Sequence, residues 1–561
     1  MKKIRIGTRR SNLAIYQAKR VSNVLEHAGI PTQIVEISSA GDRSLGGNLS
    51  EGLGQFVTSV DNRLISGEID IAVHSSKDVP VEKTSSVTCL AYLERGPTSD
   101  IILFRKSGKR KDLSTVLKEE TSSSIEEVMA VIPKGGKFGS SSVRRQSFFL
   151  ARRKDVLPLA VRGNVESRIQ KLVEGKLDAI ILAEAGLSRL QETGSLSESA
   201  LKLGALRIPK KYWPTAPGQG AICIHCLSDR IVELSNIREI LNHQQTEIDV
   251  SIEKEILRRL GGGCQFPAGI ESNEGEIQGL IAPDNWRETY SSGSDYELKE
   301  IHDRDVKEVK FSTPYQEVQG TNSGPKIVST LNSDRLTKSL SNVGIPSTNI
   351  PVIQLDLIPE NWPELSFDQT SPKSNWPVLV LTSPFSAKAA SLMAPLRPNL
   401  QRIMWLAIGE GTARSCFRQG YPASITANSR NRKELLQYIL QNIKPEIPLF
   451  IPQSSSSSGY LAKMLAKAGY IVDSWVAYSN SPKQVNVTDI RNEDILLLSS
   501  PSSAESWIGN NLLIPEKILC MGDSTKTSLD LLDGFRGKQI SVLEGPTLQG
   551  IEDWWNQNIG G

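Results

Sequence analysis

The sequence predicts an α/β protein made of several domains, and three observations lead to this fold class. Short apolar strand patterns alternate with amphipathic helix patterns along most of the chain. The length of 561 residues exceeds what one hydrophobic core usually supports. At 311–325 the pattern gives way to Gly, Ser, Thr and Pro, so we expect a linker there, with few contacts crossing between halves that each have their own core.

The composition is that of a soluble globular protein with a formal net charge of +3. The sequence has no apolar run long enough for a membrane span, and it begins in a strand pattern rather than in a signal peptide. We therefore expect a cytoplasmic protein with no membrane partner. The six cysteines are scattered, which argues against a disulfide framework. Cys223 and Cys226 have CxxC spacing without a second pair, so no metal site is expected.

The first stretch, residues 1–93, alternates strand and helix patterns. In the turn from Gly7 to Ala14, Ser11 is placed to cap a helix that runs to about His27. Arg9 lies beside the N-terminus of that helix, a position that favours anions. Residues 39–54 hold many Gly and Ser with few apolar anchors, and we expect them to form a mobile lid.

An apolar strand pattern at 69–74 then runs into Ser-Ser-Lys77-Asp78. The carboxyl end of a strand is where α/β folds place their chemistry. Lys77 and Asp78 could reach one ligand with opposite charges, and the carboxylate could protonate a leaving amine and then stabilise the remaining cation. The competing interpretation is a solvated turn closed by Pro80.

Arginine is concentrated in the front half, because 23 of the 32 arginines lie in residues 1–310. Within a second α/β unit at 98–205, turns of small residues carry these side chains. Guanidinium groups and the N–H groups of such turns bind carboxylates. No basic stripe with interleaved aromatic residues accompanies them, so we expect small anions rather than nucleic acid as ligands. The arginines on these turns are Arg144, Arg145, Arg162, Arg168 and Arg189, with Gly163 beside Arg162.

A glycine-rich turn, Gly261-Gly262-Gly263-Cys264, ends the amphipathic pattern of residues 246–260. Three glycines before a thiol remove side-chain bulk and let a large group approach the sulfur. Considered alone, the turn is more simply a helix C-cap with a buried small residue.

Seven segments together resemble porphobilinogen deaminase (hydroxymethylbilane synthase) in order and spacing: GTRRSNLA, AVHSSKDVP, GSSSVRRQ, RGNVESR, AGLSRL, PGQGAI and GGCQFPAG. The resemblance covers residues 1–310. It implies two domains similar to type II periplasmic binding proteins, at 1–93 with 206–230 and at 98–205, and a small α/β domain at 231–310. Two places depart from the family pattern: Leu53 lies where the lid usually has a lysine nearby, and Ile222-Cys223-Ile224-His225 replaces a usually acidic strand.

The resemblance implies a dipyrromethane cofactor attached through Cys264 and a catalytic carboxylate at Asp78. Asp78 would assist the loss of ammonia from porphobilinogen, and the cofactor would attack the resulting azafulvene. Four repeats and a hydrolysis would release hydroxymethylbilane. The implied cofactor contacts are Lys77, Ser11, Arg144, Arg145, Arg162 and Gly163, and the implied substrate contacts are Arg9, Arg168 and Arg189.

The second half, residues 326–561, contains an internal duplication. A strand at 378–381 leads into Thr382-Ser383-Pro384, and a strand at 495–498 leads into Ser499-Ser500-Pro501. Each is followed by a Gly-x-x-Thr segment, the second of which ends at Thr525. The duplication predicts two similar lobes that face one cleft, at 326–351 with 481–561 and at 356–478. The serine-rich turn that begins at Ser454 is interpreted as anion-binding.

This half resembles uroporphyrinogen-III synthase, which would close hydroxymethylbilane with inversion of its last ring. The resemblance suggests Tyr478 as a proton donor and hydroxyl groups as substrate contacts, at Thr382, Ser383, Ser454, Ser499, Ser500 and Thr525. The sequence therefore predicts a monomeric, bifunctional enzyme of tetrapyrrole biosynthesis that acts on small molecules. Two alternatives stay open: a deaminase with a degenerate, non-catalytic C-terminal half, and a pair of tandem anion-binding modules. The missing export signal and the Gly-Gly-Cys turn argue against the second.

Overall fold

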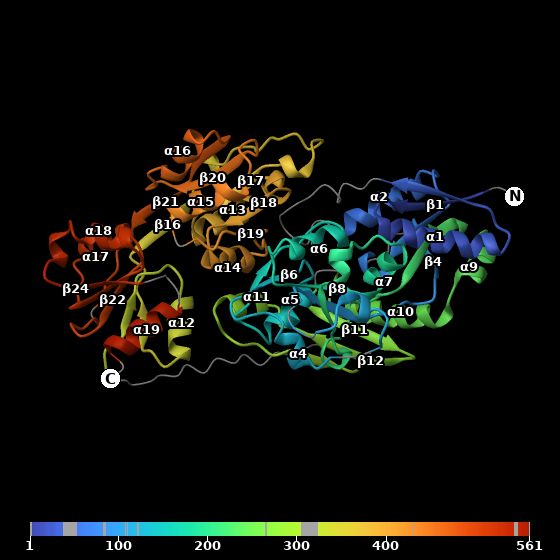
Figure 1. The fold of residues 1–561 in the computed structure, drawn as a ribbon, viewed down its shortest axis with the longest axis horizontal. Helices are drawn as coiled ribbons and strands as arrows, with labels where there is room; N and C mark the ends of the chain where they lie inside the picture. The colour runs from blue at the N-terminus through green and yellow to red at the C-terminus, as the bar shows by residue number, and fades with distance from the viewer. Residues whose placement is uncertain are drawn as a thin grey trace.

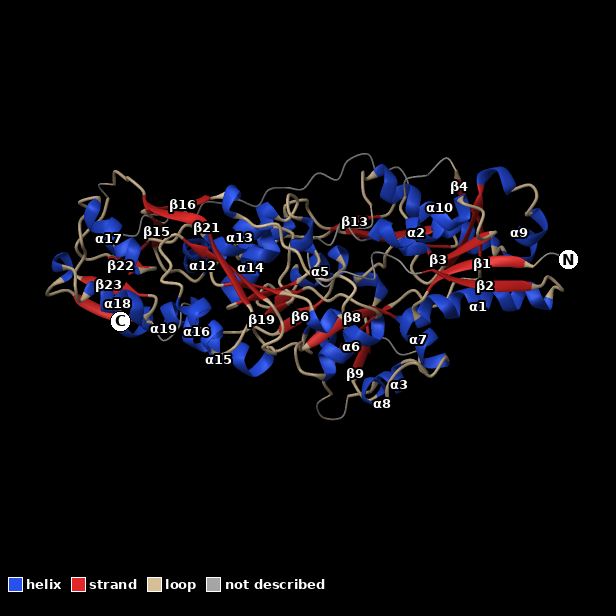
Figure 2. Ribbon diagram, turned by 90° about the horizontal axis from the view of Figure 1, so that it is seen from above, coloured by secondary structure: helices blue, strands red, loops and turns tan. Residues whose placement is uncertain are grey.

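The structure is a computed structural model that describes residues 3–37, 53–81, 86–106, 108, 110–120, 123–263, 266–303, 324–429, 431–487, 489–543 and 548–559. These residues form five β-sheets with helices packed on them in an elongated molecule (Figures 1 and 2). The multidomain α/β class predicted from the alternating patterns is confirmed. Residues 38–52, 264 and 304–323 lie outside the described residues, and with them most of the expected lid, Cys264 and most of the expected linker.

The first sheet has the strand order β2-β1-β3-β10-β4, in which β10 is antiparallel to both of its neighbours. Helices α1 (Asn12–His27) and α9 (Ser235–Leu241) pack on one face. Helices α2 (Leu53–Ile65) and α10 (Gln244–Arg259) pack on the other. The strands are β1 (Ile4–Arg9), β2 (Thr32–Ile37), β3 (Ile71–Ser75), β4 (Val87–Tyr92) and β10 (Ile222–Leu227).

The second sheet has the order β7-β6-β8-β5-β9, and the third is an antiparallel meander, β11-β12-β13. The chain leaves the first sheet after β4 and returns to it at β10, so two segments cross between the first two sheets. The strands are β5 (Asp100–Phe104), β6 (Lys137–Gly139), β7 (Leu157–Leu159), β8 (Ala179–Ala183), β9 (Gly204–Arg207), β11 (Ala268–Asn273), β12 (Glu276–Ile281) and β13 (Lys299–Ile301). The helices are α3 (Leu113–Val116), α4 (Ile125–Met129), α5 (Val143–Leu150), α6 (Val165–Val173), α7 (Glu184–Glu192), α8 (Glu198–Leu201) and α11 (Trp286–Ser291).

The two C-terminal sheets have the orders β15-β14-β22-β23-β24 and β16-β21-β20-β17-β18-β19. Their strands are β14 (Ile327–Ser329), β15 (Ser347–Asn349), β16 (Ile353–Leu357), β17 (Val378–Leu381), β18 (Met404–Ala407), β19 (Ile425–Thr426), β20 (Leu449–Ser454), β21 (Val472–Pro482), β22 (Ile495–Leu498), β23 (Lys517–Cys520) and β24 (Gln539–Val542). Their helices are α12 (Arg335–Asn342), α13 (Pro384–Met393), α14 (Glu410–Arg418), α15 (Arg432–Asn442), α16 (Tyr460–Lys467), α17 (Pro501–Gly509), α18 (Asp523–Leu529) and α19 (Leu548–Asn558). None of the described helices is long and apolar enough to cross a membrane.

The predicted duplication is confirmed in the backbone. Ser383 caps α13 and Ser500 caps α17, each with extended dihedral angles, a proline in the first turn and a reciprocal hydrogen bond with the serine three residues later. Gly409 and Gly522 are the extended N-cap residues of α14 and α18. The same strand–turn–helix units therefore occur in both C-terminal sheets.

The two halves of the chain are in close contact, which corrects the expectation that few contacts cross between them. Phe417 of α14 is fully buried and packs edge-on against Trp286 and Tyr290 of α11, with ring centroids 5.5 and 5.4 Å away. The Arg414 guanidinium lies 4.8 Å above the Tyr290 ring. The polar composition of the linker did not reveal this contact, because the aromatic side chains that form it lie outside the linker.

We expect Phe417→Ala to lower the free energy of unfolding by about 3–5 kcal/mol, since a buried ring is replaced by a cavity. Amide hydrogen exchange in α11, which belongs to the other half of the chain, should become faster. Phe535→Ala is the matched control. Phe535 is also buried, but it packs within the C-terminal half, in the core beside the sheet β15-β14-β22-β23-β24. Unchanged exchange in α11 of the Phe417 variant would show that the halves are not coupled there.

Candidate active site

The loop after β3 forms a short 3₁₀ turn, Ser76–Asp78, at the carboxyl end of the strand. Ser76 is buried, whereas Lys77 and Asp78 are half-buried. The Ser76 N–H donates to the carbonyl of Ala221 at 3.0 Å. A side chain at Gly218 would come within 2.6 Å of the Ser76 hydroxyl, so the returning segment packs closely on this loop. The loop is therefore packed against the segment that returns to the first sheet. It is not the solvated turn that the sequence also allowed.

A pocket with about 440 Å³ of empty space lies beside this loop and draws its walls from three parts of the chain. Lys77 comes from the loop after β3, Arg144 from the first turn of α5, and Lys254 from α10. Gly263, the residue before Cys264, also lines this pocket. We call it the cofactor pocket. Its other lining residues are Val79, Val81, Ser142, Ala216, Pro217, Leu257, Phe266 and Ala268.

A second, smaller hollow, which is open to solvent, is lined by Arg145 and Arg168 together with residues in and next to the second sheet. The Arg168 Nε donates to the carbonyl of Gly163 at 2.8 Å. Gly163 has φ +107°, and a Cβ there would meet the Ser167 hydroxyl at 2.2 Å, so this turn requires glycine. Burial and the charge of Arg145 lower the pKa of Arg168 to about 10.

Two of the positive groups that the sequence singled out, Lys77 and Arg168, interact electrostatically with Asp78. The Arg168 guanidinium interacts electrostatically with Arg145, Asp78, Arg162 and Arg9, of which only Asp78 favours its charge. Burial, with a further contribution from Arg145, lowers the pKa of Lys77 to about 8. The site therefore has an excess of positive charge, which a polycarboxylate ligand would relieve.

Asp100, at the start of β5, holds the two arginines of α5 in place. Its fully buried carboxylate accepts hydrogen bonds from Arg144 at 2.7 Å and Arg145 at 2.6 Å. The Trp213 indole and the Gln219 amide also donate to it, each at 2.9 Å. Burial alone would raise the pKa of Asp100, but the charges of the two arginines outweigh burial and keep its pKa below the ordinary value. Arg145 thus forms an ion pair with Asp100 and also lines the smaller hollow.

Glu253 of α10 is a second buried acid, and it holds the third sheet in place. Its buried carboxylate accepts hydrogen bonds from Arg95 at 2.7 and 3.0 Å and from the N–H groups of Gly218 and Ser272 at 2.7 and 2.8 Å. These bonds join both crossing segments to the unit that carries the glycine turn. The next residue, Lys254, faces the cofactor pocket.

Six of the predicted deaminase residues are not in the lining of either pocket: Arg9, Ser11, Asp78, Arg162, Gly163 and Arg189. Ser11 caps α1, where its hydroxyl accepts a hydrogen bond from the Ala14 N–H at 3.3 Å. Arg189 is buried, and its Nη2 donates to the carbonyl of Gly220 at 2.6 Å, so it supports the returning segment. Similar caps begin α5 and α6, with Ser142 and Asn164 as the capping residues.

The three glycines before Cys264 differ in what they do. Gly261 has φ +68°, and the N–H groups of Gly261 and Gly262 close the end of α10 on the carbonyls of Arg258 and Leu257 at 3.0 Å each. A side chain at Gly262 would lie 2.5 Å from the Phe266 ring. At Gly263, no described atom lies within 4 Å of the place a Cβ would occupy. The C-cap interpretation is thus correct for the first two glycines, and the third leaves space beside the cofactor pocket.

In the C-terminal half, the structure brings Tyr478 and Ser383 together. Their hydroxyl groups are 2.9 Å apart, and the Tyr478 ring packs 4.8 Å from Phe385. Burial raises the pKa of Tyr478, although the Ser383 hydrogen bond opposes this. The Asn480 amide lies 3.4 Å from the hydroxyls of both Ser456 and Ser502, and so connects the two C-terminal sheets.

The other predicted C-terminal residues lie at the strand ends. Ser499 contacts Thr330 at 3.2 Å, and Ser454 contacts Ser456 at 3.0 Å. Ser500 caps its helix, and Thr382 is half-buried after β17. Thr525 is 2% exposed inside the first turn of α18, so a ligand could reach its hydroxyl only if that helix start moved.

Asp100, Glu253 and Lys254 were missed by the sequence analysis. A weak signal exists for each: an acid directly before the apolar run of β5, and charged residues within the amphipathic pattern of α10. Such signals do not identify a partner, because Asp100 and Trp213 are 113 residues apart.

Known proteins resemble both halves of the chain. A family model described as "Porphobilinogen deaminase, dipyromethane cofactor binding domain" matches residues 4–233, and one described as "Uroporphyrinogen-III synthase HemD" matches residues 334–547. The porphobilinogen deaminase of Syntrophomonas wolfei is 35% identical over 303 residues, covering 53% of this chain and 90% of the relative. That of Shouchella clausii is 38% identical over 294 residues, covering 51% and 86%. Uroporphyrinogen-III synthetase from Helicobacter pylori aligns with 42% of this chain and 99% of its own at 15% identity and a TM-score of 0.30.

The fold and the family matches define an enzyme that acts on small-molecule substrates, and the chain belongs to the porphobilinogen deaminase family. It joins this deaminase to a uroporphyrinogen-III synthase domain and is a bifunctional enzyme of heme biosynthesis. Neither alternative, a degenerate C-terminal half or a pair of binding modules, is better supported.

We expect Asp100→Asn to lower the free energy of unfolding by about 3–5 kcal/mol, because two buried arginines would lose their common partner. The measurement is denaturant unfolding of the full chain. Asp295→Asn is the matched control, since Asp295 pairs with Lys154 on the surface and its side chain is 77% exposed. Equal stability of the two variants would mean that Asp100 does not hold the arginines together.

Proposed function

We propose that the cofactor pocket holds a dipyrromethane attached to Cys264, and that Asp78 is the catalytic acid for its extension by porphobilinogen. The observation that carries this proposal is the convergence of Lys77, Arg144 and Lys254, from three parts of the chain, on a pocket whose wall includes Gly263. Arg9, Arg162 and Arg168 would neutralise the carboxylates of the incoming unit.

The residues present fit such a cofactor. Its acetate and propionate groups need cationic partners, and the pocket supplies two lysines and an arginine. The Arg144 Nε is buried without a hydrogen-bond partner among the described residues, so this guanidinium keeps one donor beyond its contacts with Asp100 and Pro214. The space beside Gly263 lets the ring next to the sulfur pass the backbone. When bound, the cofactor would supply the pyrrole carbon to which each new unit is joined.

Asp78 is suited to a proton transfer followed by charge stabilisation. It is half-buried just after the end of β3 and interacts electrostatically with Lys77 and Arg168, and a carboxyl group in this place can transfer a proton and then stabilise a substrate cation. Lys77 would bind a cofactor carboxylate, which would raise its pKa from about 8 because an opposite charge favours the ammonium form.

For the C-terminal half we propose that uroporphyrinogen III forms between the two C-terminal sheets, with Tyr478 as proton donor to the departing hydroxyl. Ser383 orients the Tyr478 hydroxyl, and the hydroxyl-lined turns at Ser454 and Ser499 face the junction that Asn480 bridges. Closure of an already reactive substrate depends mainly on positioning, so a buried phenol and neutral hydroxyls are sufficient.

We further propose that the chain acts as a cytoplasmic monomer without nucleic acid, since one chain supplies every wall of the cofactor pocket. Its units would be 1–93 with 206–230, 98–205, 231–310, 326–351 with 481–561, and 356–478, joined at 311–325. The sheets support this division, although β16 and β21 extend the fifth unit to 353–482.

Asp78→Asn tests the first site. We expect release of ammonia from porphobilinogen to fall by at least about 100-fold, because an amide cannot transfer the proton. The melting temperature should change little, since Asp78 is half-buried at a loop. Glu166→Gln, in the first turn of α6, is a carboxylate control that should retain activity. A loss of only two- or three-fold in the Asp78 variant would assign Asp78 a structural role.

Tyr478→Phe tests the second site in the same full chain. We expect bilane closure to slow by about 10–100-fold while ammonia release is unchanged, because only the hydroxyl is lost. The assay oxidises the product and separates type I from type III porphyrin, and the variant should shift it toward type I. Tyr470→Phe is the control, since the Tyr470 hydroxyl contacts backbone carbonyls of α15 and its C-cap. Undiminished type III product from the Tyr478 variant would remove Tyr478 from the mechanism.

A further inference from the structure

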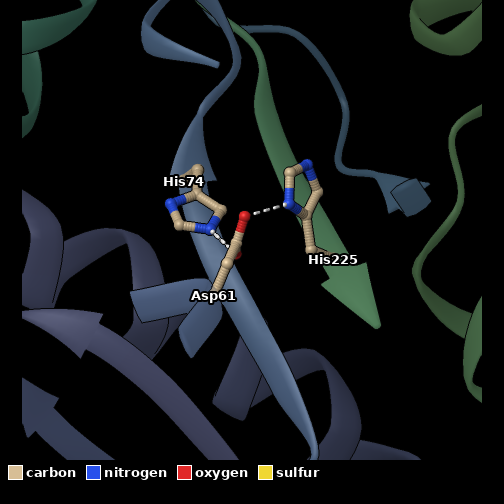
Figure 3. Close-up of side chains that lie close together, drawn as sticks. All are labelled: Asp61, His74 and His225. Atoms are coloured by element: carbon tan, nitrogen blue, oxygen red, sulfur yellow. Dashed lines mark hydrogen bonds and ion pairs between the residues drawn. The ribbon is translucent and has the colours of Figure 1, made fainter. Parts of the chain in front are cut away.

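Three side chains of types that bind metal ions meet at the first sheet (Figure 3). His74 comes from β3, His225 from β10 and Asp61 from α2. The Asp61 carboxylate lies 2.8 Å from His74 Nε2 through one oxygen and 3.3 Å from His225 Nδ1 through the other. The potential ligand atoms all lie within 4.8 Å of one another.

The local fold explains why these side chains share one place. Cys223 and His225 of β10 point to the same face of the sheet, because alternate residues of a strand do so. Cys223 pairs with His74 across β3, and His225 pairs with Cys89 across β4, so two imidazoles and two thiols occupy this face. Cys226 lies on the opposite face, in the core with α1, so the CxxC spacing does not form a ligand pair.

The Asp61 carboxylate is held differently from three other buried acids of this half. Asp70, Asp100 and Glu253 are each held by arginine. At Asp61, whose side chain is 14% exposed, both oxygens instead face imidazoles that are 4% and 9% exposed. A buried carboxylate is costly without a compensating charge, and a divalent cation between the three groups would supply it.

We propose that Asp61, His74 and His225 bind a divalent transition metal ion of the zinc type. Two imidazole nitrogens and a carboxylate oxygen are ligands that Zn²⁺ accepts at about 2.0–2.2 Å, so tetrahedral ligands lie about 3.3–3.5 Å apart. The separation between Asp61 and His225 lies in this range, whereas the 2.8 Å between Asp61 and His74 would have to lengthen and the overall spread of up to 4.8 Å would have to shorten on binding. The same face of the sheet also carries Cys89 and Cys223.

The position of the site suggests its effect. The ion would join the end of β3 to α2 and β10, four residues before Asp78, and so would stabilise the base of the catalytic loop. Binding would displace the proton shared between Asp61 and each ligating nitrogen, as metal sites require. This inference does not depend on the proposed roles of Asp78 or Cys264.

The test uses the full chain, purified after growth with zinc and dialysed into metal-free buffer. We expect about one zinc per chain by plasma mass spectrometry, a higher melting temperature on adding Zn²⁺ to stripped protein, and the visible absorption of tetrahedral Co²⁺ on adding that ion. His225→Gln and Asp61→Asn should abolish all three signals. His302→Gln is the matched control, because His302 also contacts a carboxylate, at 2.9 Å, but its side chain is 68% exposed.

The zinc content and the Co²⁺ spectrum of the wild type test the proposal even if a variant is unstable, because both are measured without any variant. Circular dichroism of the stripped variants verifies that each is folded. A wild-type chain that retains no zinc and gives no tetrahedral Co²⁺ spectrum would overturn the proposal and leave a hydrogen-bonded His-Asp-His cluster. Equal zinc in the wild type and both folded site variants would also overturn it.

Discussion

One buried carboxylate, Asp100, determines the geometry of the deaminase half. Two guanidinium groups, an indole and an amide converge on it, and they come from α5 and from the segment that returns to the first sheet. The three buried charges are those of Asp100, Arg144 and Arg145. Burying them is favourable only when all three are paired in good geometry, which restricts the cluster to one arrangement of these side chains. That arrangement directs Arg144 into the cofactor pocket and Arg145 into the neighbouring hollow.

The second buried acid, Glu253, places the third unit relative to the other two. Through Arg95 and the N–H of Gly218 it contacts both crossing segments, and through the N–H of Ser272 it contacts β11. The glycine turn follows directly from the same helix. Asp100 and Glu253 together therefore bring three parts of the chain around one pocket. Each of these two acids is paired with arginine, and Arg168, Lys77 and Lys254 add further positive charge to the walls of the two pockets.

Local features of this structure were predictable from sequence, and long-range ones were not. The caps at Ser11, Ser142, Asn164, Ser383 and Ser500 depend on a side chain and an N–H three residues away, so a short pattern identifies them. The resemblance to known families selected most of the charged residues at the pocket. The roles of Asp100 and Lys254 were not predicted, because the residues around them in the structure are distant in sequence. The same holds for the contact of Phe417 with α11. Arg189 was selected by its setting in a turn, yet its guanidinium binds the backbone of Gly220.

The contact between the halves gives the bifunctional chain a physical basis for acting as one unit. Helix α14 of the synthase half rests on α11, which packs in turn on α5 of the deaminase half. Arg414 and Phe417 occupy this contact, and the backbone of Ala423 accepts a hydrogen bond from Ala160 at the end of β7. The synthase half therefore lies against the unit whose first helical turn carries Arg144 and Arg145.

The central claim is that the pocket beside Gly263 holds a covalent cofactor on Cys264, and the intact mass of the purified wild-type chain tests it most directly. The account predicts a mass above that of the bare polypeptide by one dipyrromethane, located by peptide mapping at Cys264 and absent from the Cys264→Ala variant. The other five cysteines should be unmodified. A bare polypeptide mass in a preparation that still converts porphobilinogen would contradict the account.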